Sequence, residues 1–166
     1  KDLSKTILFH TDAVQAAGFL PLSTSELGVD MLSLSSHKFY GPKGLGILFI
    51  KRGTPYVPLL MGGGQERERR SGTENIPLIV GGALAFEIAQ NEMESNSGHC
   101  RRLTNELVAG INERLPSAIL NGHPVQRIAN NAHFSFPGLE GEAILLGLDL
   151  QGGSYLLLEV ESSVLI

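Results

Sequence analysis

The sequence is poor in cysteine, and it has neither a block of basic residues nor a long apolar run. Its single cysteine, Cys100, excludes an intramolecular disulfide and suits a reducing compartment. The 13 Lys and Arg residues and 17 Asp and Glu residues give a formal net charge of −4, which offers no electrostatic footprint for nucleic acid or anionic lipid. No apolar run is long enough to span a bilayer. The sequence therefore indicates no nucleic-acid partner and no membrane partner.

Residues 1–5 do not have the charged-then-apolar layout of a signal peptide. We therefore expect a cytoplasmic location, with an organelle interior reached through a cleaved presequence as the alternative. Hydrophobic residues make up 42% of the chain, which is enough to bury a core.

Three short apolar segments predict buried strands at residues 6–9, 29–34 and 45–50. Two of them end in clusters of polar residues, and an open α/β sheet places its site at the carboxyl ends of its strands. Three such strands need covering layers that a chain of this length scarcely supplies. We therefore expect the chain to be part of a larger α/β fold.

Residues 54–75 show little periodicity but many glycines and charged side chains, which predicts a long ordered loop. Asn75 can then cap a helix that has Pro77 in its first turn and runs to about Glu94. The first half of this helix is apolar nearly all round, so we expect it to be buried.

The rest of the chain predicts a small second domain. A helix is expected over residues 100–115, where Leu and Ile recur every fourth residue. Strands are expected at residues 118–120 and 132–136, followed by a helix near residues 141–148.

A lysine, Lys38, follows the second predicted strand in the polar segment 35–44. Because Lys38 lies between two predicted strands, we expect it to be at least partly enclosed. Enclosure disfavours the charged ammonium and leaves an amine that can attack an aldehyde. Ser35, His37 and nearby backbone N–H groups could hold a phosphate. The alternative is a surface lysine in a polar loop, with His37 packed on Tyr40.

A carboxylate, Asp12, closes the first apolar segment, and the amide of Gln15 follows three residues later. Pyridoxal phosphate (PLP) needs such a pair. A carboxylate against the pyridinium nitrogen keeps the ring protonated, so that the ring accepts electrons, while an amide N–H can orient the phenolic oxygen. The alternative is an aspartate that caps a short helix, with Gln15 exposed. The two motifs together, in this order, indicate a PLP site.

Four stretches make the sequence similar to the NifS/IscS-type cysteine desulfurases, which are class-V aminotransferase, fold-type I PLP enzymes. The stretches are His-Thr-Asp-Ala-Val-Gln-Ala-Ala-Gly (10–18), Ser-Ser-His-Lys-Phe-Tyr-Gly-Pro-Lys-Gly (35–44), Gly-Gly-Gly-Gln-Glu-Arg (62–67) and Arg-Ser-Gly-Thr-Glu-Asn (70–75). The resemblance covers residues 5–152.

The resemblance implies three regions. Residues 1–95 would be the C-terminal half of the large PLP-binding domain, and residues 96–152 part of a smaller α+β C-terminal domain. Residues 153–166 would be an atypical tail.

The resemblance also implies a role for each site residue, with no metal among the ligands. Lys38 would hold the cofactor as a Schiff base and move the Cα proton. Thr73 would reach the phosphate of the other subunit's cofactor, so the family is a homodimer with shared sites. Asp12 would contact the pyridine nitrogen and Gln15 the phenolic oxygen. The implied phosphate contacts are Ser35, Ser36 and His37.

Members of the family remove sulfur from L-cysteine. A separate catalytic cysteine takes the sulfur as a persulfide, L-alanine is released, and the sulfur passes to an acceptor or scaffold protein for iron–sulfur cluster or thiocofactor assembly. Two alternatives stay open. Selenocysteine lyases share these motifs, and a truncated, non-catalytic chain could bind PLP poorly or only form a dimer.

The sequence departs from the family at both ends. The family has a long segment before residue 1, with a His that stacks on the PLP ring and an Asn near the phenolic oxygen. After Gly152 it has a Ser/Gly-rich loop with the catalytic cysteine, and then an arginine for the substrate carboxylate. In residues 153–166, the stretch Tyr-Leu-Leu-Leu at 155–158 instead favours a strand. We expect them to be foreign to the fold, through a frameshift or read-through; a short C-terminal strand in a shortened homologue is the alternative.

Cys100 stands beside Arg101 and Arg102 at the start of the second predicted helix, where a thiolate would be stabilised. The family has no nucleophile at this position, and an ordinary cysteine at a helix terminus is the simpler interpretation. We therefore expect the chain alone not to desulfurate cysteine.

Overall fold

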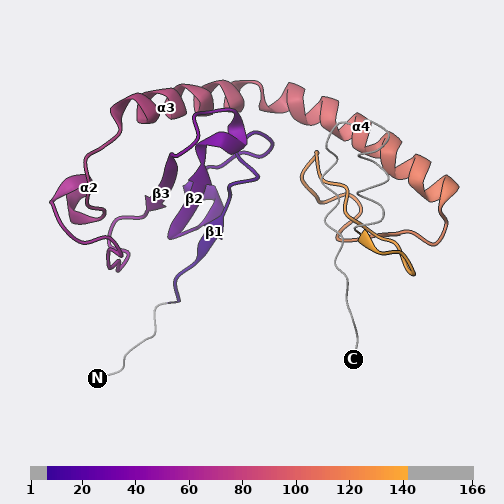
Figure 1. Ribbon diagram of the computed structural model, residues 1–166, viewed down its shortest axis with the longest axis horizontal. Helices are drawn as coiled ribbons and strands as arrows, with labels where there is room; N and C mark the ends of the chain where they lie inside the picture. Colours follow the sequence, from indigo (N-terminus) through magenta and orange to yellow (C-terminus); the bar gives the residue numbers. More distant parts are fainter. Residues whose placement is uncertain (1–6, 142–166) are drawn as a thin grey trace. The chain divides into compact units, whose positions relative to one another are not determined.

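A three-stranded sheet organises the first part of the chain in the computed structural model, which describes residues 7–141 (Figure 1). The strand order is β1-β2-β3; β1 is parallel to β2, and β2 is antiparallel to β3. By its contacts the chain divides into two units, between Asn96 and Ser97. The elements of the first unit are β1 (His10–Asp12), α1 (Thr24–Leu27), β2 (Met31–Ser35), the 3₁₀ helix η1 (Ser36–Phe39), β3 (Gly46–Ile50), α2 (Gln65–Glu68) and α3 (Ile76–Asn91).

The second and third predicted strands are confirmed as β2 and β3, but the first was placed too early. Burial is found in β2 and was a wrong expectation for β3, which has no buried residue because no described element covers it fully. Residues 7–9 are not in a strand, and residue 6 lies outside the described residues. The reason is visible at Phe9, whose backbone N–H donates to the carboxylate of Asp30 (3.0 Å), while its carbonyl accepts from the N–H groups of Asp30 and Met31. The ladder proper therefore begins at His10.

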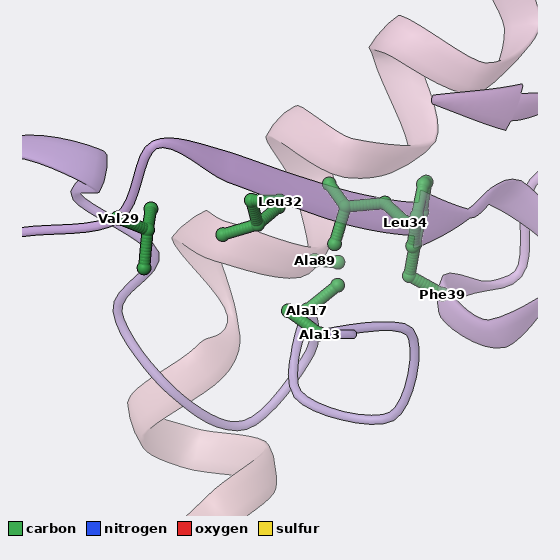
Figure 2. Packing of buried hydrophobic residues seen from close by; sticks show 7 residues of the cluster. All are labelled: Ala13, Ala17, Val29, Leu32, Leu34, Phe39 and Ala89. Carbon is green, nitrogen blue, oxygen red and sulfur yellow. The ribbon is translucent and has the colours of Figure 1, made fainter. Parts of the chain in front are cut away.

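The two faces of the sheet differ in chemistry, because successive side chains of a strand point to opposite sides. On one face Leu32 and Leu34 of β2 are buried. Figure 2 shows these leucines gathered with Ala13 and Ala17 from the turn after β1 and with Ala89 from α3. The buried cluster consists of Ala13, Ala17, Val29, Leu32, Leu34, Phe39 and Ala89.

Helix α3 begins as the sequence predicts. The side chain of Asn75 accepts a hydrogen bond from the N–H of Leu78 (3.3 Å), and a proline stands in the first turn. Further along, the rings of Phe86 and Phe39 meet edge to face, with centroids 5.5 Å apart, which fixes α3 against η1.

Burial of the first half of α3 was a wrong expectation for the described residues. Gly82 and Ala89 are the buried positions of the helix, and a stripe of four large apolar side chains stays 47–62% exposed. The described sheet and η1 cover one side of the helix, so an all-round apolar sequence leaves its other side bare. We call this set the α3 stripe: Ile76, Val80, Leu84 and Ile88.

The break between the two long helices also lies earlier than predicted. Helix α3 ends at Asn91, and α4 (Met93–Arg114) follows after one residue, rather than near Cys100. Residues 93–99 are mostly polar and show no apolar period, so the periodicity gave no sign that they are helical.

The second unit is smaller and less regular. Its strands β4 (Ile119–Leu120) and β5 (Phe134–Ser135) pair antiparallel, which confirms both predicted strands in shortened form. The hydroxyl of Thr104 on α4 donates to the carbonyl of Ala129 (2.8 Å). Most of the helix predicted at residues 141–148, and all of the tail at residues 153–166, lie outside the described residues. Among the helices of residues 7–141, none is both long and apolar enough to cross a membrane.

Candidate functional site

The carboxyl ends of β1 and β2 lie at the same edge of the sheet, because the two strands are parallel. Asp12 is the last residue of β1 and Ser35 the last residue of β2. In the register of this pair Asp12 lies opposite Ser33, so Ser35 is two residues further along the neighbouring strand. This edge therefore collects the polar residues that follow both strands.

The carboxylate of Asp12 is held by one oxygen and open at the other. Its Oδ1 accepts a hydrogen bond from the N–H of Val14 (3.0 Å), which starts the run of turns after β1. Its Oδ2 has no hydrogen-bond partner among the described residues, and the side chain is exposed. The capping role and the ligand role are thus compatible, since the cap occupies only Oδ1.

Helix η1 presents Lys38 directly after the end of β2. Both His37 and Lys38 are exposed, so the expected enclosure of the lysine is not found in the described residues. The physical reason is that no described element covers this edge of the sheet. The imidazole Nδ1 of His37 is hydrogen bonded to Ser35 Oγ (2.9 Å), and Tyr40 is 95% exposed, so His37 does not pack on Tyr40.

Ser36 differs from the other predicted phosphate contacts, Ser35 and His37, in its burial. Its side chain is fully buried, and its Oγ has no hydrogen-bond partner among the described residues. Its N–H donates to the carbonyl of Leu45 (3.1 Å), and its own carbonyl accepts from the N–H of Gly41 (3.0 Å). Helix η1 thus turns the Ser36 hydroxyl into the core, while Ser35, His37 and Lys38 keep side chains that are at least partly exposed.

The structure does not bring Gln15 or Thr73 into contact with the other candidates. Gln15 is exposed on the turns after β1, and Thr73 is exposed between α2 and α3. Thr73 lines a cavity of about 820 Å³ that runs beside β3, with Leu48 and Arg70 among the other lining residues. Asp12, Ser35 and Lys38 do not line this cavity.

The loop that carries Thr73 is ordered by its own polar contacts, as the sequence predicts. The N–H of Gly72 donates to the side-chain oxygen of Gln65 (3.2 Å), and the hydroxyl of Ser71 donates to the carbonyl of Gly63 (3.0 Å). These two contacts join the ends of the Gly/Arg-rich segment.

Cys100 is not at a helix start. It lies within α4, which begins at Met93, and it is partly buried. The helix N-terminus that would stabilise a thiolate is therefore two turns away.

One contact at the site escaped the sequence analysis. His10 Nε2 and Ser33 Oγ lie 2.8 Å apart and are hydrogen bonded across β1 and β2. The available signal was alternation: His10 and Asp12 are two residues apart on one strand, as are Ser33 and Ser35 on the next, so all four share a face of the sheet.

The donor set fits PLP. The free Oδ2 of Asp12 suits a pyridinium N–H, and the Ser35–His37 pair offers a hydroxyl and an imidazole to a phosphate. Lys38 offers a primary amine to an aldehyde, and it takes part in no ion pair within residues 7–141. The three groups stand on two adjacent strand ends and the helix between β2 and β3.

The sequence pattern of the aminotransferase class-V family matches residues 2–154, and the chain belongs to this family. It is 49% identical to cysteine desulfurase IscS of Methanosarcina thermophila over 146 residues, which are 88% of this chain and 36% of the relative. It is 48% identical to a cysteine desulfurase of Sinorhizobium fredii over 145 residues, or 87% of this chain and 38% of the relative. The chain thus spans little more than a third of the curated relatives it matches.

Solved structures agree with the sequence relatives. A NifS-like protein superposes with a TM-score of 0.82 at 42% identity, covering 90% of this chain and 40% of that chain. The NifS-like protein of Rickettsia africae gives 0.80 at 30% identity, covering 89% and 41%. The expected α/β fold, part of the fold-type I architecture of PLP enzymes, is therefore confirmed.

A second, shorter pattern, the SecD/SecF GG motif, matches residues 146–164. This range includes most of the tail, all of it beyond the described residues. The tail resembles a known motif in the frame in which it is read. The two matches overlap at residues 146–154, and the origin of the tail stays a prediction.

Proposed function

We propose that the protein is a PLP-dependent cysteine desulfurase, which takes sulfur from L-cysteine and releases L-alanine. The observation that carries this proposal is the meeting of Asp12, with its free Oδ2, and the Ser35–His37–Lys38 segment at the carboxyl ends of two adjacent parallel strands. The relatives named cysteine desulfurase support the choice of substrate.

Each residue has a definite task in this proposal. When bound, PLP supplies a ring that accepts the electrons of the substrate's Cα–H bond. Asp12 holds the ring nitrogen protonated, and Gln15 orients the phenolic oxygen. Ser35 and His37 bind the phosphate, and Lys38 makes the covalent link and carries the Cα proton.

The sulfur would leave as a persulfide on a separate cysteine and pass to an acceptor protein for iron–sulfur cluster or thiocofactor assembly. The active form would be a homodimer, in which Thr73 contacts the phosphate of the cofactor bound to the other subunit. We also propose that residues 1–95 belong to the large PLP-binding domain and residues 96–152 to the small domain. The division of the chain between Asn96 and Ser97 supports this assignment.

Chemical labelling tests the proposal at its central residue. After incubation with PLP and reduction with borohydride, peptide mapping should find the pyridoxyl group on Lys38. Lys38→Ala should abolish both the label and the violet absorbance of the bound cofactor. The neighbouring Lys43 and Lys51 serve as internal controls, since a label on either one instead would refute the assignment.

A further inference from the structure

The hydrogen bond between His10 and Ser33 joins the first residue of β1 to the middle of β2. The Nε2 and Oγ atoms are 2.8 Å apart. Ser33 is also the register partner of Asp12, which lies two residues after His10 on β1. The bond therefore ends on the residue that faces Asp12 across the strand pair.

Ser33 holds β1 by a second contact, through its backbone. Its carbonyl accepts a hydrogen bond from the N–H of Ala13 (3.0 Å), the residue directly after Asp12. Asp12 thus stands between two residues, His10 and Ala13, that are both bonded to Ser33. One residue of β2 consequently fixes the segment of β1 on both sides of the carboxylate.

The side-chain bond lies on the polar face of the sheet. Because side chains alternate along a strand, His10 and Asp12 share a face with Ser33 and Ser35, opposite the face that buries Leu32. The bond therefore forms beside the Asp12 carboxylate and does not form part of the apolar packing.

The shortness of β1 makes this contact matter. The strand has three residues and, among described elements, pairs only with β2. A side-chain hydrogen bond contributes on the order of 1 kcal/mol, comparable to one ladder bond of so short a strand. The side-chain bond therefore adds to the ladder and to the backbone contacts of Phe9 and Ala13 in aligning β1 with β2.

From this geometry we propose that the His10–Ser33 pair positions Asp12 against the cofactor's ring nitrogen. The proposal rests on the proposed function, because it assumes that Asp12 meets PLP. His10 is a positioning residue: it acts through Ser33 and the backbone of β1, and it does not touch the reacting atoms. By keeping β1 in register with β2, the pair sets the place of Asp12 relative to Ser35 and Lys38.

The experiment compares amides of two lengths at His10. The side-chain amide of His10→Gln reaches the position of Nε2 and can bond to Ser33, whereas the shorter amide of His10→Asn cannot. Ser33→Ala removes the other partner. Each variant of the 166-residue chain is loaded with PLP, and the visible absorbance of the cofactor is titrated with pH.

A protonated ring withdraws electrons from the covalent link between PLP and Lys38, and this lowers the proton affinity of the link. A displaced Asp12 should therefore raise the midpoint of this titration. His10→Asn and Ser33→Ala should raise it by about 0.5–1 pH unit, a fraction of the 1–3 units that a contacting opposite charge produces. His10→Gln should keep the wild-type midpoint.

The decisive control repeats His10→Asn in an Asp12→Asn background. If the pair acts through Asp12, the further shift disappears, because no carboxylate is left to position. Two outcomes would overturn the positioning role alone, in a chain that carries PLP on Lys38. In one, His10→Asn raises the titration midpoint equally with and without Asp12→Asn; in the other, His10→Asn leaves the midpoint unchanged. A wild-type chain that takes up no PLP on Lys38 overturns the proposed function together with this inference.

Discussion

The carboxylate of Asp12 caps a turn with one oxygen and leaves the other for the proposed cofactor. One carboxylate oxygen caps the turns that follow β1, and the other has no partner in the described part of the chain. Capping alone does not account for the position of this aspartate at the sheet edge where Ser35 and Lys38 follow β2. The charge of Asp12, rather than its shape, is therefore the property to test.

Asp12→Asn keeps the capping oxygen and removes the charge. In a full-length relative, at the matching position, we expect PLP to remain bound while desulfuration slows roughly 10²–10³-fold, because the electron-accepting ring loses its electrostatic partner. Steady-state alanine release measures the effect, and the absorbance of bound PLP controls for cofactor loss. Near-normal turnover would refute the role.

Ser36 has a buried polar atom that should cost stability. Its hydroxyl is buried and has no partner within residues 7–141. Ser36→Ala should therefore raise the free energy of unfolding by about 1 kcal/mol. The midpoint of urea unfolding at constant slope measures this gain.

Ser23→Ala is the matched control for Ser36→Ala. The hydroxyl of Ser23 accepts from the N–H of Glu26 at the start of α1 (3.4 Å), so its loss should lower stability by up to about 1 kcal/mol. A Ser36→Ala variant that also loses stability would show that the hydroxyl has a favourable contact.

At the scale of the elements, the sequence predicted the helix caps, strands and loops that depend on residues close together in the chain. The Asn75 cap, strands β2 and β3, and the ordered loop before α3 are all confirmed. The start of β1 was missed because it depends on Asp30, some twenty residues away, which no periodicity reveals. The exposed Lys38 and the α3 stripe were missed because burial depends on covering layers that the described chain does not supply.

The packing of η1 on α3 gives an element-scale prediction. A Cβ at Gly41 would overlap Ser36 Oγ and would lie 3.1 Å from Ser36 O and 3.2 Å from the Cβ of Ala85 on α3. Gly41→Ala should therefore lower the free energy of unfolding by about 1–3 kcal/mol. Chemical denaturation measures the loss.

Two further variants isolate the cause. Gly98→Ala, on α4 with nothing within 4 Å of the new Cβ, should instead stabilise by about 0.5–1 kcal/mol. Adding Ser36→Ala to Gly41→Ala should recover part of the loss, since it removes the overlapping oxygen. Strict additivity of the two changes would contradict the proposed overlap.

At the scale of the whole molecule, family membership and activity are separate matters. The chain covers 36% of the M. thermophila relative, although the matching part is 49% identical. The PLP motifs lie within this part, whereas the catalytic cysteine loop and the substrate arginine implied by the family resemblance are not found in the 166 residues.

We therefore expect residues 1–166 alone not to release sulfide from L-cysteine in the presence of PLP and thiol. A full-length relative under the same conditions is the positive control, and the Lys38→Ala chain sets the background. Sulfide release above that background would overturn the prediction and return attention to Cys100.

The α3 stripe has a consequence for how the chain behaves in a test tube. Four apolar side chains at every fourth position face water along one side of this helix in the described part of the chain. Contiguous apolar patches of this kind drive association between molecules. The colloidal behaviour of the chain should accordingly depend on its concentration, with larger clusters in concentrated stocks than in dilute solution, while the fold of each molecule stays the same.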